Sequence, residues 1–290
     1  MGFELIAPNL YYFKINFCGI YVAVYLKRGK KNVLIDSGMN AKDVDEIIVP
    51  ALKKLKLDIT DINILLNTHT HADHIGGHHR IKELNPNIKV ITTKLSKEKV
   101  ENPLKFNIEI RQVFPNDSPS PSYGLKGVLV DELINDGDVI EGLKIIFTPG
   151  HDNDAVCFLD LDTKTLLTGD SIQQNGTDTQ GMALYMYLEP YIASLKKLKT
   201  LDIERIISGH PFNPWGGNIS GKEKVREFLD FNLNLVEEYH SLVKENINKE
   251  MCDIVHLIID NYNGIKPDYL FLGLYTVKEH INKIKKEKGI

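Results

Sequence analysis

Short apolar runs alternate with amphipathic stretches along the first two hundred residues, and turn residues separate them. Runs of a few residues rich in Val, Ile, Leu, Thr and Tyr are typical of strands, whereas apolar residues that recur every three or four positions are typical of helices. This alternation predicts an α/β fold in which helices cover layers of sheet. The runs that predict strands are Leu10–Ile15, Tyr21–Leu26, Asn32–Ile35, Ile62–Leu66, Lys89–Thr93, Lys144–Phe147, Val156–Leu159, Thr165–Thr168 and Arg205–Ile207.

Two pairs of these runs lie close enough in the sequence to form antiparallel hairpins. Residues 27–31 join the second run to the third, and residues 160–164 join Val156–Leu159 to Thr165–Thr168. Purely parallel, doubly wound sheets contain no such pairs. We therefore predict a sandwich rather than a doubly wound sheet.

Helical patterns account for much of the remaining sequence, and they dominate its last part. The stretches are 41–56, 75–84, 188–199, 221–246 and Tyr275–Lys288. Pro50 predicts a kink or a stop in the first of them, because proline removes a backbone donor. The strand patterns stop at residue 217, so we expect a catalytic domain at 1–215 and a helical extension at 216–290.

Residues 101–125 contain the run Asp-Ser-Pro-Ser-Pro-Ser at 117–122. Long connections of this kind are either functional or passive. We expect a surface insertion here, acting as a lid over a cleft or as a passive loop.

Composition and charge narrow the class of protein. The chain of 290 residues is 42% hydrophobic and 26% charged, which indicates a globular protein rather than a disordered or collagen-like one. Its 35 basic and 39 acidic residues give a net charge of -4, which provides no general attraction to nucleic acid or anionic membranes. No apolar run approaches the roughly 18 residues of a membrane helix. Cys18, Cys157 and Cys252 are scattered and odd in number, so we expect reduced thiols and a cytoplasmic protein.

The densest group of chemically active residues follows the apolar run Ile62–Leu66. It reads Thr68-His69-Thr70-His71-Ala72-Asp73-His74-Ile75-Gly76-Gly77. Where a strand leaves a sheet, residues two apart project the same way, so His69 and His71 can converge on one ion. The following turn can present Asp73 and His74 to a neighbouring point. The segment therefore predicts ligands for two metal ions, with a solvated histidine-rich loop as the alternative.

Three later strands end in the same way, with a glycine followed by one side chain that can bind metal. These side chains are His151 after Lys144–Phe147, Asp170 after Thr165–Thr168 and His210 after Arg205–Ile207. A glycine permits the tight turn that lifts the next side chain off the sheet edge. The repetition favours one shared site.

Together these segments resemble the metallo-β-lactamase superfamily, whose signature His-x-His-x-Asp-His is followed by separate His, Asp and His ligands. The resemblance covers roughly residues 8–215. It implies a four-layer αββα sandwich with a dinuclear site at one sheet edge. The first metal would be bound by His69, His71 and His151, the second by Asp73, His74 and His210, and Asp170 would bridge them.

The resemblance does not identify the metal. Seven ligands exceed the four of one tetrahedral zinc, which agrees with two ions. Zinc is the first choice, and iron and manganese remain alternatives because His and carboxylate ligands suit all three.

The segment Val33-Leu34-Ile35-Asp36-Ser37-Gly38 matches another recurring part of the family. By this resemblance Asp36 lies near the site without binding metal. We expect it to accept an imidazole N–H and so fix the tautomer of that histidine. An ordinary Asp-Ser-Gly turn is the alternative.

Two cations that share a hydroxide lower its pKa towards neutrality, so hydrolysis is the expected chemistry. Asp73 would orient the hydroxide and carry a proton to the leaving group. Tyr185, or alternatively Tyr187, is a candidate donor to the developing oxyanion. Aromatic packing beneath the next helix is the alternative for both.

The motifs depart from several branches of the family. Zinc β-lactamases lack an aspartate where Asp170 stands, flavodiiron proteins have a glutamate where His71 stands, and the tRNA-processing nucleases carry an insertion that is not evident here. The group that remains resembles glyoxalase II, thioesterases and lactonases. We expect a metal-bridging hydroxide that attacks a small ester, thioester or lactone. The alternatives are a metal-dependent endoribonuclease or phosphodiesterase, and an iron oxidoreductase or metal-dependent binding protein of the same fold.

The end of the chain, Tyr275 to Gly289, resembles a winged-helix-like element that some family hydrolases carry, including ones that cut RNA. Residues 217–290 hold 11 basic and 12 acidic residues, so no phosphate-binding excess supports a nucleic-acid partner. A helical cap over the cleft, or a contact in a homodimer, is the simpler interpretation. We expect a small-molecule substrate and neither a membrane nor a nucleic-acid partner.

Overall fold

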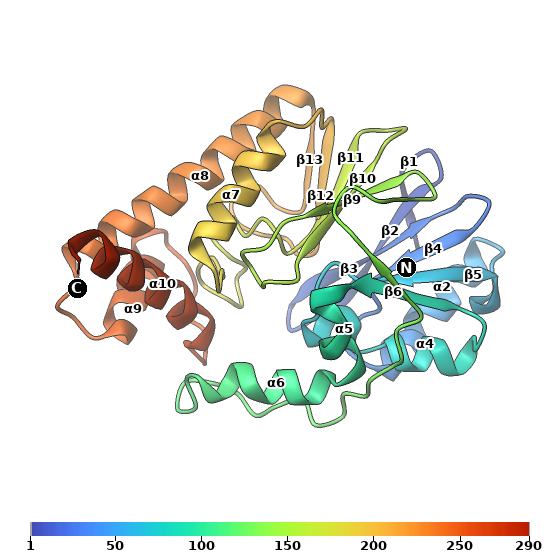
Figure 1. The fold of residues 1–290 in the computed structure, drawn as a ribbon, viewed down its shortest axis with the longest axis horizontal. Helices are drawn as coiled ribbons and strands as arrows, with labels where there is room; N and C mark the ends of the chain where they lie inside the picture. Colours follow the sequence, from blue (N-terminus) through green and yellow to red (C-terminus); the bar gives the residue numbers. More distant parts are fainter. Residues whose placement is uncertain (1, 290) are drawn as a thin grey trace.

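The computed structural model describes residues 2–289, in which two β-sheets face each other and helices cover both outer surfaces (Figure 1). The first sheet has the strand order β1 (Glu4–Ala7), β2 (Leu10–Phe17), β3 (Ile20–Lys27), β4 (Asn32–Ile35), β5 (Ile62–Leu66), β6 (Lys89–Thr93) and β7 (Glu132–Ile134). The second has the order β13 (Asn218–Ser220), β12 (Arg205–Ser208), β11 (Thr165–Gly169), β10 (Val156–Asp160), β9 (Leu143–Phe147) and β8 (Val139–Ile140).

The predicted strands agree with the structure. All nine are present, each within two residues of its expected bounds. β3 pairs antiparallel with β4, and β10 pairs antiparallel with β11, so both predicted hairpins are confirmed. The strands β1, β7, β8 and β13 escape prediction because each is only two to four residues long and too short to show a period.

Apolar side chains alternate between the two faces of each strand. Along β3, Ala23 and Tyr25 pack between the sheets with Phe158 of β10, whereas Val24 and Leu26 pack towards the outer helices. Both faces of the strand are buried, which explains runs that are apolar throughout. The predicted αββα architecture is confirmed.

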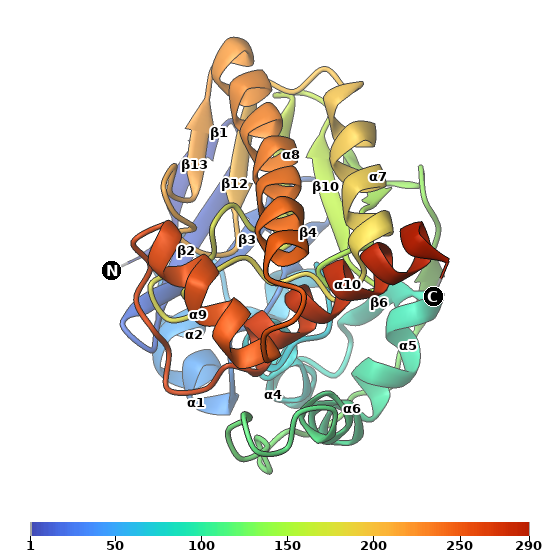
Figure 2. The same cartoon turned by 90° about the vertical axis from the view of Figure 1, so that its left-hand side faces the viewer.

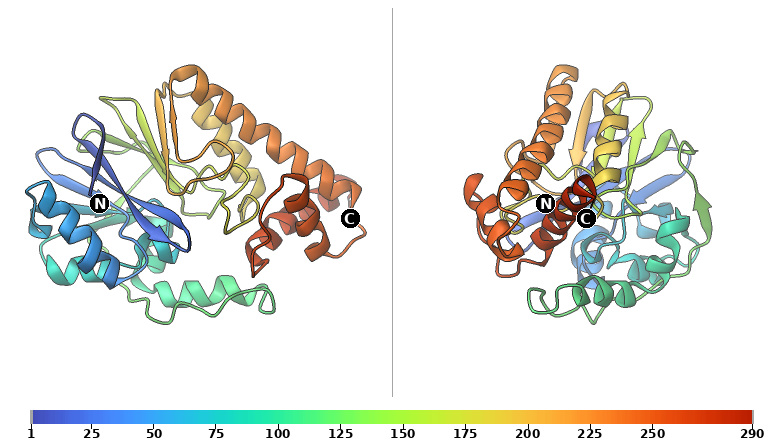
Figure 3. Two further views of the ribbon diagram at one scale, coloured as in Figure 1. Left: turned by 180° about the vertical axis from the view of Figure 1, so that it is seen from behind. Right: turned by 60° about the vertical axis from the view of Figure 1, so that its left-hand side comes forward.

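The helices are divided between the two outer surfaces. The first sheet is covered by α1 (Ala41–Asp43), α2 (Val49–Lys54), α3 (Ala72–Ile75) and α4 (His78–Leu84), with a π-type turn at Val44–Ile48 and a 3-10 turn at Ile59–Asp61. After β6 come α5 (Lys94–Glu101) and α6 (Pro103–Gln112). The second sheet is covered by α7 (Leu188–Lys199) and α8 (Lys222–Glu245), which lie side by side, and the chain ends in α9 (Met251–Asn261) and α10 (Phe271–Lys288) (Figures 2 and 3).

Three expectations from the sequence require correction. The first helical stretch does not stop at Pro50, since helical residues continue to Lys54; the helix is instead irregular there, with the π-type turn Val44–Ile48 two residues before this proline. Residues 101–125 are not a loop throughout, since Pro103–Gln112 form α6, on which apolar residues recur at helical spacing. The strands do not stop at residue 217 either, because β13 (Asn218–Ser220) pairs antiparallel with β12.

The C-terminal helices share an apolar core with the second sheet. Val236 of α8, Ile258 of α9 and Val277 of α10 belong to the same buried cluster as Leu166 of β11. Residues 221–289 contain helices and turns only, so the strands that make the wing of a winged helix have no counterpart there. None of the helices in the described part of the chain combines the length and hydrophobicity that a membrane span requires.

A buried ion pair joins the two sheets at the edge where β3 and β10 end. The Nζ of Lys27 pairs with the carboxylate of Asp160, and their side chains are only 5% and 0% exposed. The other oxygen of Asp160 accepts hydrogen bonds from the backbone N–H groups of Asp162 and Thr163, at 3.1 and 3.0 Å. Both buried charges are therefore satisfied, and each depends on its partner.

We expect Lys27→Met to lower the free energy of unfolding by about 3–5 kcal/mol, because it leaves the Asp160 carboxylate buried without a counter-charge. Lys164→Met removes a lysine that pairs with Asp202 at the solvent-exposed surface, and it should lower the free energy of unfolding far less. Unfolding of the two variants in urea measures the difference. Equal losses would contradict the role of Lys27 as a link between the sheets.

Candidate metal centre

Strands from both sheets end at one edge of the sandwich, and the residues that follow them meet there. β4 and β5 run parallel in the first sheet, as do β11 and β12 in the second, so within each pair the carboxyl ends lie at the same edge. Backbone hydrogen bonds join the sheets at this edge, from Val156 N to Thr68 O at 2.8 Å and from Ala23 N to Gly209 O at 2.7 Å. All seven predicted ligands converge here: His69, His71, Asp73, His74, His151, Asp170 and His210.

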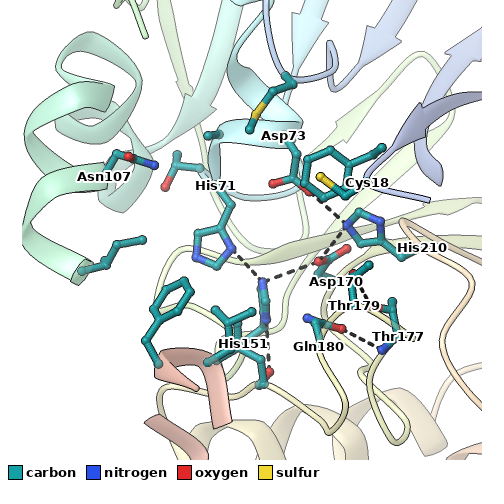
Figure 4. Close-up of a pocket in the computed structure, with 18 of the residues that line it drawn as sticks. Cys18, His71, Asp73, Asn107, His151, Asp170, Thr177, Thr179, Gln180 and His210 are labelled. Atoms are coloured by element: carbon teal, nitrogen blue, oxygen red, sulfur yellow. Dashed lines mark hydrogen bonds and ion pairs between the residues drawn. The ribbon is translucent and has the colours of Figure 1, made fainter. Parts of the chain in front are cut away.

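His69, His71 and His151 form the first group, with their ligand atoms all within 4.8 Å of one another. The Nε2 of His151 lies 3.0 Å from the Nδ1 of His71, and these two rings point towards each other (Figure 4). Two ligands of a tetrahedral ion with bonds of about 2.0–2.1 Å lie roughly 3.3 Å apart. The spacing therefore fits a single metal ion.

Asp73, His74 and His210 form the second group. The Oδ2 of Asp73 lies 3.1 Å from the Nε2 of His210 and 3.6 Å from that of His74. Asp170 lies between the groups, because its Oδ2 is 3.7 Å from His151 Nε2 and 3.4 Å from His210 Nε2 (Figure 4). The structure thus brings together every ligand that the sequence predicts, with Asp170 in the central position.

Asp36 fixes the orientation of His74. Its Oδ2 accepts a hydrogen bond from His74 Nδ1 at 2.9 Å, which turns the Nε2 of that ring towards the other ligands. The same carboxylate accepts the backbone N–H of Thr68 at 2.7 Å and the Thr68 hydroxyl at 2.8 Å. The expectation that Asp36 accepts an imidazole N–H is confirmed.

Backbone carbonyl groups orient two more rings. His151 Nδ1 donates to the carbonyl oxygen of Leu184 at 3.1 Å, and His210 Nδ1 donates to that of Tyr21 at 2.6 Å. In both residues the Nε2 consequently faces the centre. Such hydrogen bonds select the tautomer whose free nitrogen can bind metal.

Glycines permit the close approach of these loops. A Cβ at Gly169, where φ is +48°, would lie 2.4 Å from Thr68 Oγ1. A Cβ at Gly209 would lie 2.4 Å from the Oδ1 of Asp170. A larger residue at either position would displace a ligand or the residue that supports one.

Burial and charge set the protonation of the two groups. Burial lowers the pKa of His69 and His151 and lowers that of His71 to about 3, so the first group is neutral and able to bind metal. Although burial acts in the opposite direction, nearby carboxylates raise the pKa of His74 well above its usual value and raise that of His210 to about 10. A metal ion that binds the second group must therefore displace protons.

Several ligand atoms lack a hydrogen-bond partner. His69 Nε2, His74 Nε2 and Asp170 Oδ1 are buried and make no hydrogen bond, although His74 Nε2 and Asp170 Oδ1 lie 3.4 Å apart as an ion pair. Buried polar atoms are nearly always paired, so an unpaired set that faces a common point indicates a missing partner. A mixed set of imidazole and carboxylate ligands fits metal ions of the zinc, iron or manganese type.

A charged network behind His71 was not expected from the sequence. The Oδ2 of Asp152 lies 3.7 Å from His71 Nε2, and neither atom has a hydrogen-bond partner. Lys99 Nζ donates to the other oxygen of Asp152 at 2.8 Å and lies 3.4 Å from Asp154 Oδ1. The acidic residues that follow His151 could have been noticed in the sequence. Lys99 lies on a separate helix, and nothing in the sequence around it indicates a contact with them.

A cavity of about 250 Å³ opens beside the ligands. Its apolar wall includes Phe106 and Ile110 of α6, Leu125, and Phe271 and Leu272 at the start of α10. Thr177, Thr179 and Gln180 provide a polar wall, and Figure 4 shows them across from the helix that carries Asn107. His71, Asp73, His151, Asp170 and His210 line the same space.

Tyr185 does not lie in this cavity, which corrects its expected role as an oxyanion donor. Its side chain is 1% exposed, its hydroxyl lies 2.7 Å from His280 Nε2, and its ring stacks on Tyr191. Leu184, the preceding residue, lines the cavity, and neither Tyr185 nor Tyr187 is part of the lining. Tyr185 packs beneath α7 and α10, as the alternative interpretation proposed.

Comparison with known proteins agrees with this geometry. The profile of the Metallo-beta-lactamase superfamily matches residues 17–210, which include all seven ligands. The Beta-lactamase-like protein 2 homolog of Drosophila melanogaster is 28% identical over 268 residues, which cover 90% of this chain and 81% of the relative. An atrochrysone carboxyl ACP thioesterase of Aspergillus fumigatus is 28% identical over 230 residues, which cover 78% of this chain and 60% of the relative.

Solved structures show the same fold. A metallo-beta-lactamase family protein of Thermus thermophilus superposes with a TM-score of 0.76 at 19% identity, covering 98% of this chain and 95% of the other. The likeness extends over the C-terminal helices as well as the two sheets. Since the family profile spans most of the chain and both sheets have the expected arrangement, the chain belongs to the metallo-beta-lactamase superfamily.

Proposed function

We propose that the protein is a hydrolase that uses two metal ions to cleave an ester, thioester or lactone. The observation that carries this proposal is the position of both ligand groups on the wall of the apolar cavity. A carbonyl group held in the cavity would lie directly beside the ligands. Pockets that combine an apolar wall with a few convergent polar groups are typical of small-molecule sites.

The ligand groups assign a place to each ion. His69, His71 and His151 would hold the first ion, and Asp73, His74 and His210 would hold the second, with Asp170 shared. Ions bound in this way polarise a carbonyl oxygen and lower the pKa of water enough for attack near neutral pH. Zinc is our first choice, because tetrahedral His and carboxylate sites are typical of zinc.

Asp73 is the residue best placed to move a proton. It lines the cavity and also belongs to the second ligand group. A carboxylate in this position can accept a proton from the attacking water and return it to the leaving group. His210, whose Nε2 lies 3.1 Å from Asp73 Oδ2, holds the carboxylate in place.

The cavity walls favour an acyl substrate. Phe106, Ile110 and Phe271 would contact a hydrocarbon portion, whereas Thr177 and Gln180 offer hydroxyl and amide groups. The name of the Aspergillus relative, an ACP thioesterase, supports a thioester or a related acyl compound. The endoribonuclease alternative has less support, because Arg111 is the one Lys or Arg among the lining residues, and a strand of RNA needs a row of cations.

We expect two metal ions per chain, and at least one fewer in His69→Ala, because His69 belongs to two of the possible ligand groups. Metal analysis after gel filtration gives the stoichiometry. Asp36→Asn should keep the stoichiometry but lower the metal affinity about 10–100-fold, because it weakens the hydrogen bond that orients His74. Competition with a chelator measures this affinity.

His256→Ala is the matched control for these variants, because His256 lies on α9 outside the metal centre. It should bind metal like the wild-type protein. A wild-type chain that binds no metal, or ligand variants that behave like the control, would contradict the proposed ligand set.

We expect the metal-loaded protein to hydrolyse acyl thioesters, aryl esters or lactones and to leave phosphodiesters and RNA intact. Asp73→Asn should lower kcat by about 10²–10⁴-fold, because it removes the group that accepts the proton. Asp253→Asn, at an exposed position on α9, is the control and should retain full activity. Cleavage of phosphodiesters alone would overturn the proposal, and oxygen consumption with bound iron would favour an oxidoreductase.

A further inference from the structure

α6 forms one wall of the cavity through a single face. Pro103, Phe106, Asn107, Ile110 and Arg111 all line the cavity, and these positions recur every three or four residues. The helix is fixed by α10, since the Tyr275 hydroxyl donates to the carbonyl oxygen of Ile110 at 2.7 Å. The residues on this face therefore have defined positions relative to the metal ligands.

Arg111 is the one cation on this face, and it forms no ion pair. Its Nη1 donates to the carbonyl oxygen of Asn107 at 2.8 Å, while its Nε is buried without a hydrogen-bond partner. Its guanidinium lies 5.6 Å from the centre of the Phe271 ring. Within residues 2–289 the carboxylate that acts on its charge is that of Asp73, a candidate metal ligand, which is not at ion-pair distance. The neighbouring Lys105, by contrast, pairs with Glu98 and Glu109.

An unpaired guanidinium in a largely apolar cavity is costly. Burial disfavours its charge and lowers the pKa of Arg111, and the Asp73 carboxylate only partly offsets this effect. Arginine nevertheless keeps its proton at all ordinary pH values. The planar guanidinium offers several N–H donors that match a carboxylate or phosphate in a bidentate contact. An anionic group of the substrate would supply both the missing charge and the missing acceptors.

The same helix face also contacts the metal ligands. The ring of Phe106 stacks on His71 of the first ligand group, with 6.3 Å between the ring centres. The Arg111 side chain folds back towards Asn107 and lines the same cavity as His71 and Asp73. A substrate held beside the ligands would therefore lie within the cavity that Arg111 also lines.

We propose that Arg111, on the cavity wall formed by α6, binds an oxyanion of the substrate, a carboxylate or a phosphate. The substrate class is accordingly an ester, thioester or lactone that carries a negative charge. This inference rests on the proposed hydrolase function and specifies its substrate.

Matched substrates test the inference. 4-Nitrophenyl octanoate is compared with the mono-4-nitrophenyl ester of suberic acid and with its ω-phosphonate counterpart, which distinguishes a carboxylate from a phosphate. A further pair places the carboxylate on the aryl leaving group. In at least one pair we expect the wild-type kcat/KM to favour the anionic member about tenfold or more, as for hydrogen bonds between charged groups.

Variants assign this preference to the guanidinium. Arg111→Met should lower kcat/KM for the anionic ester about tenfold or more relative to its effect on the neutral ester, so that the preference disappears, and Arg111→Lys should retain part of the preference. Lys105→Met is the matched control, because it removes a cation from the same helix outside the cavity, and it should leave the preference intact. Metal content and thermal unfolding establish that each variant is folded.

A binding measurement separates this inference from the proposed function. Calorimetric titration with suberate and with octanoate should show tighter binding of suberate to the metal-loaded wild-type protein, and Arg111→Met should remove the difference. If suberate binds more tightly and Arg111→Met removes the difference, but no ester is cleaved, the oxyanion site is supported and the hydrolase proposal fails. If esters are cleaved without preference for the anionic member, or if Arg111→Met slows both members equally, the oxyanion site is overturned.

Discussion

The metal centre depends on hydrogen bonds that point away from it. His74 turns its Nε2 inward because its Nδ1 donates to Asp36, and His151 and His210 do so because theirs donate to backbone carbonyl groups. Asp36 also holds both the N–H and the hydroxyl of Thr68, the residue before His69. One buried carboxylate therefore positions the beginning and the end of the histidine motif. The scaffold sets the geometry of the ligands before an ion binds, which limits the cost of ordering them.

The network behind His71 connects the metal ligands to the cavity wall. Lys99 contacts Asp152 behind the His71 ring, and its Nζ lies 4.1 Å from the centre of the Phe106 ring. Phe106 in turn stacks on His71. A ligand, its charged support and a wall residue thus form one packed unit. The α5–α6 segment, which lies outside every family motif in the sequence, consequently bears directly on the chemistry.

The candidate metal ligands and the walls of the cavity come from different parts of the molecule. The ligands come from strand ends of the sandwich, which members of the superfamily share as a fold. The walls of the cavity come from α6 and α10, which contact each other through Tyr275 and the backbone of Ile110. Loops and helices that cover a rigid scaffold are where differences in substrate choice usually reside. The shared fold places the candidate metal ligands, and we propose that residues of the cavity wall such as Arg111 select the substrate.

The sequence by itself determined the longer strands and which side chains are candidate metal ligands. Long apolar runs were visible from their pattern, and His69, His71, Asp73 and His74 stand together because one strand exit delivers them all. The resemblance to the family placed Asp36 beside the site, and the structure confirms its hydrogen bond to an imidazole. These features are local, so their spacing along the chain carries the information.

Only the tertiary structure decided which neighbours each side chain meets. Leu184 faces the cavity and Tyr185 faces His280, although the two are adjacent in sequence. Arg111 lines the cavity because α6 folds back over the ligands, and Lys99 reaches Asp152 across 53 positions of sequence. Contacts between such distant residues depend on how sheets and helices pack together. The short-range periodicity of the sequence does not predict that packing.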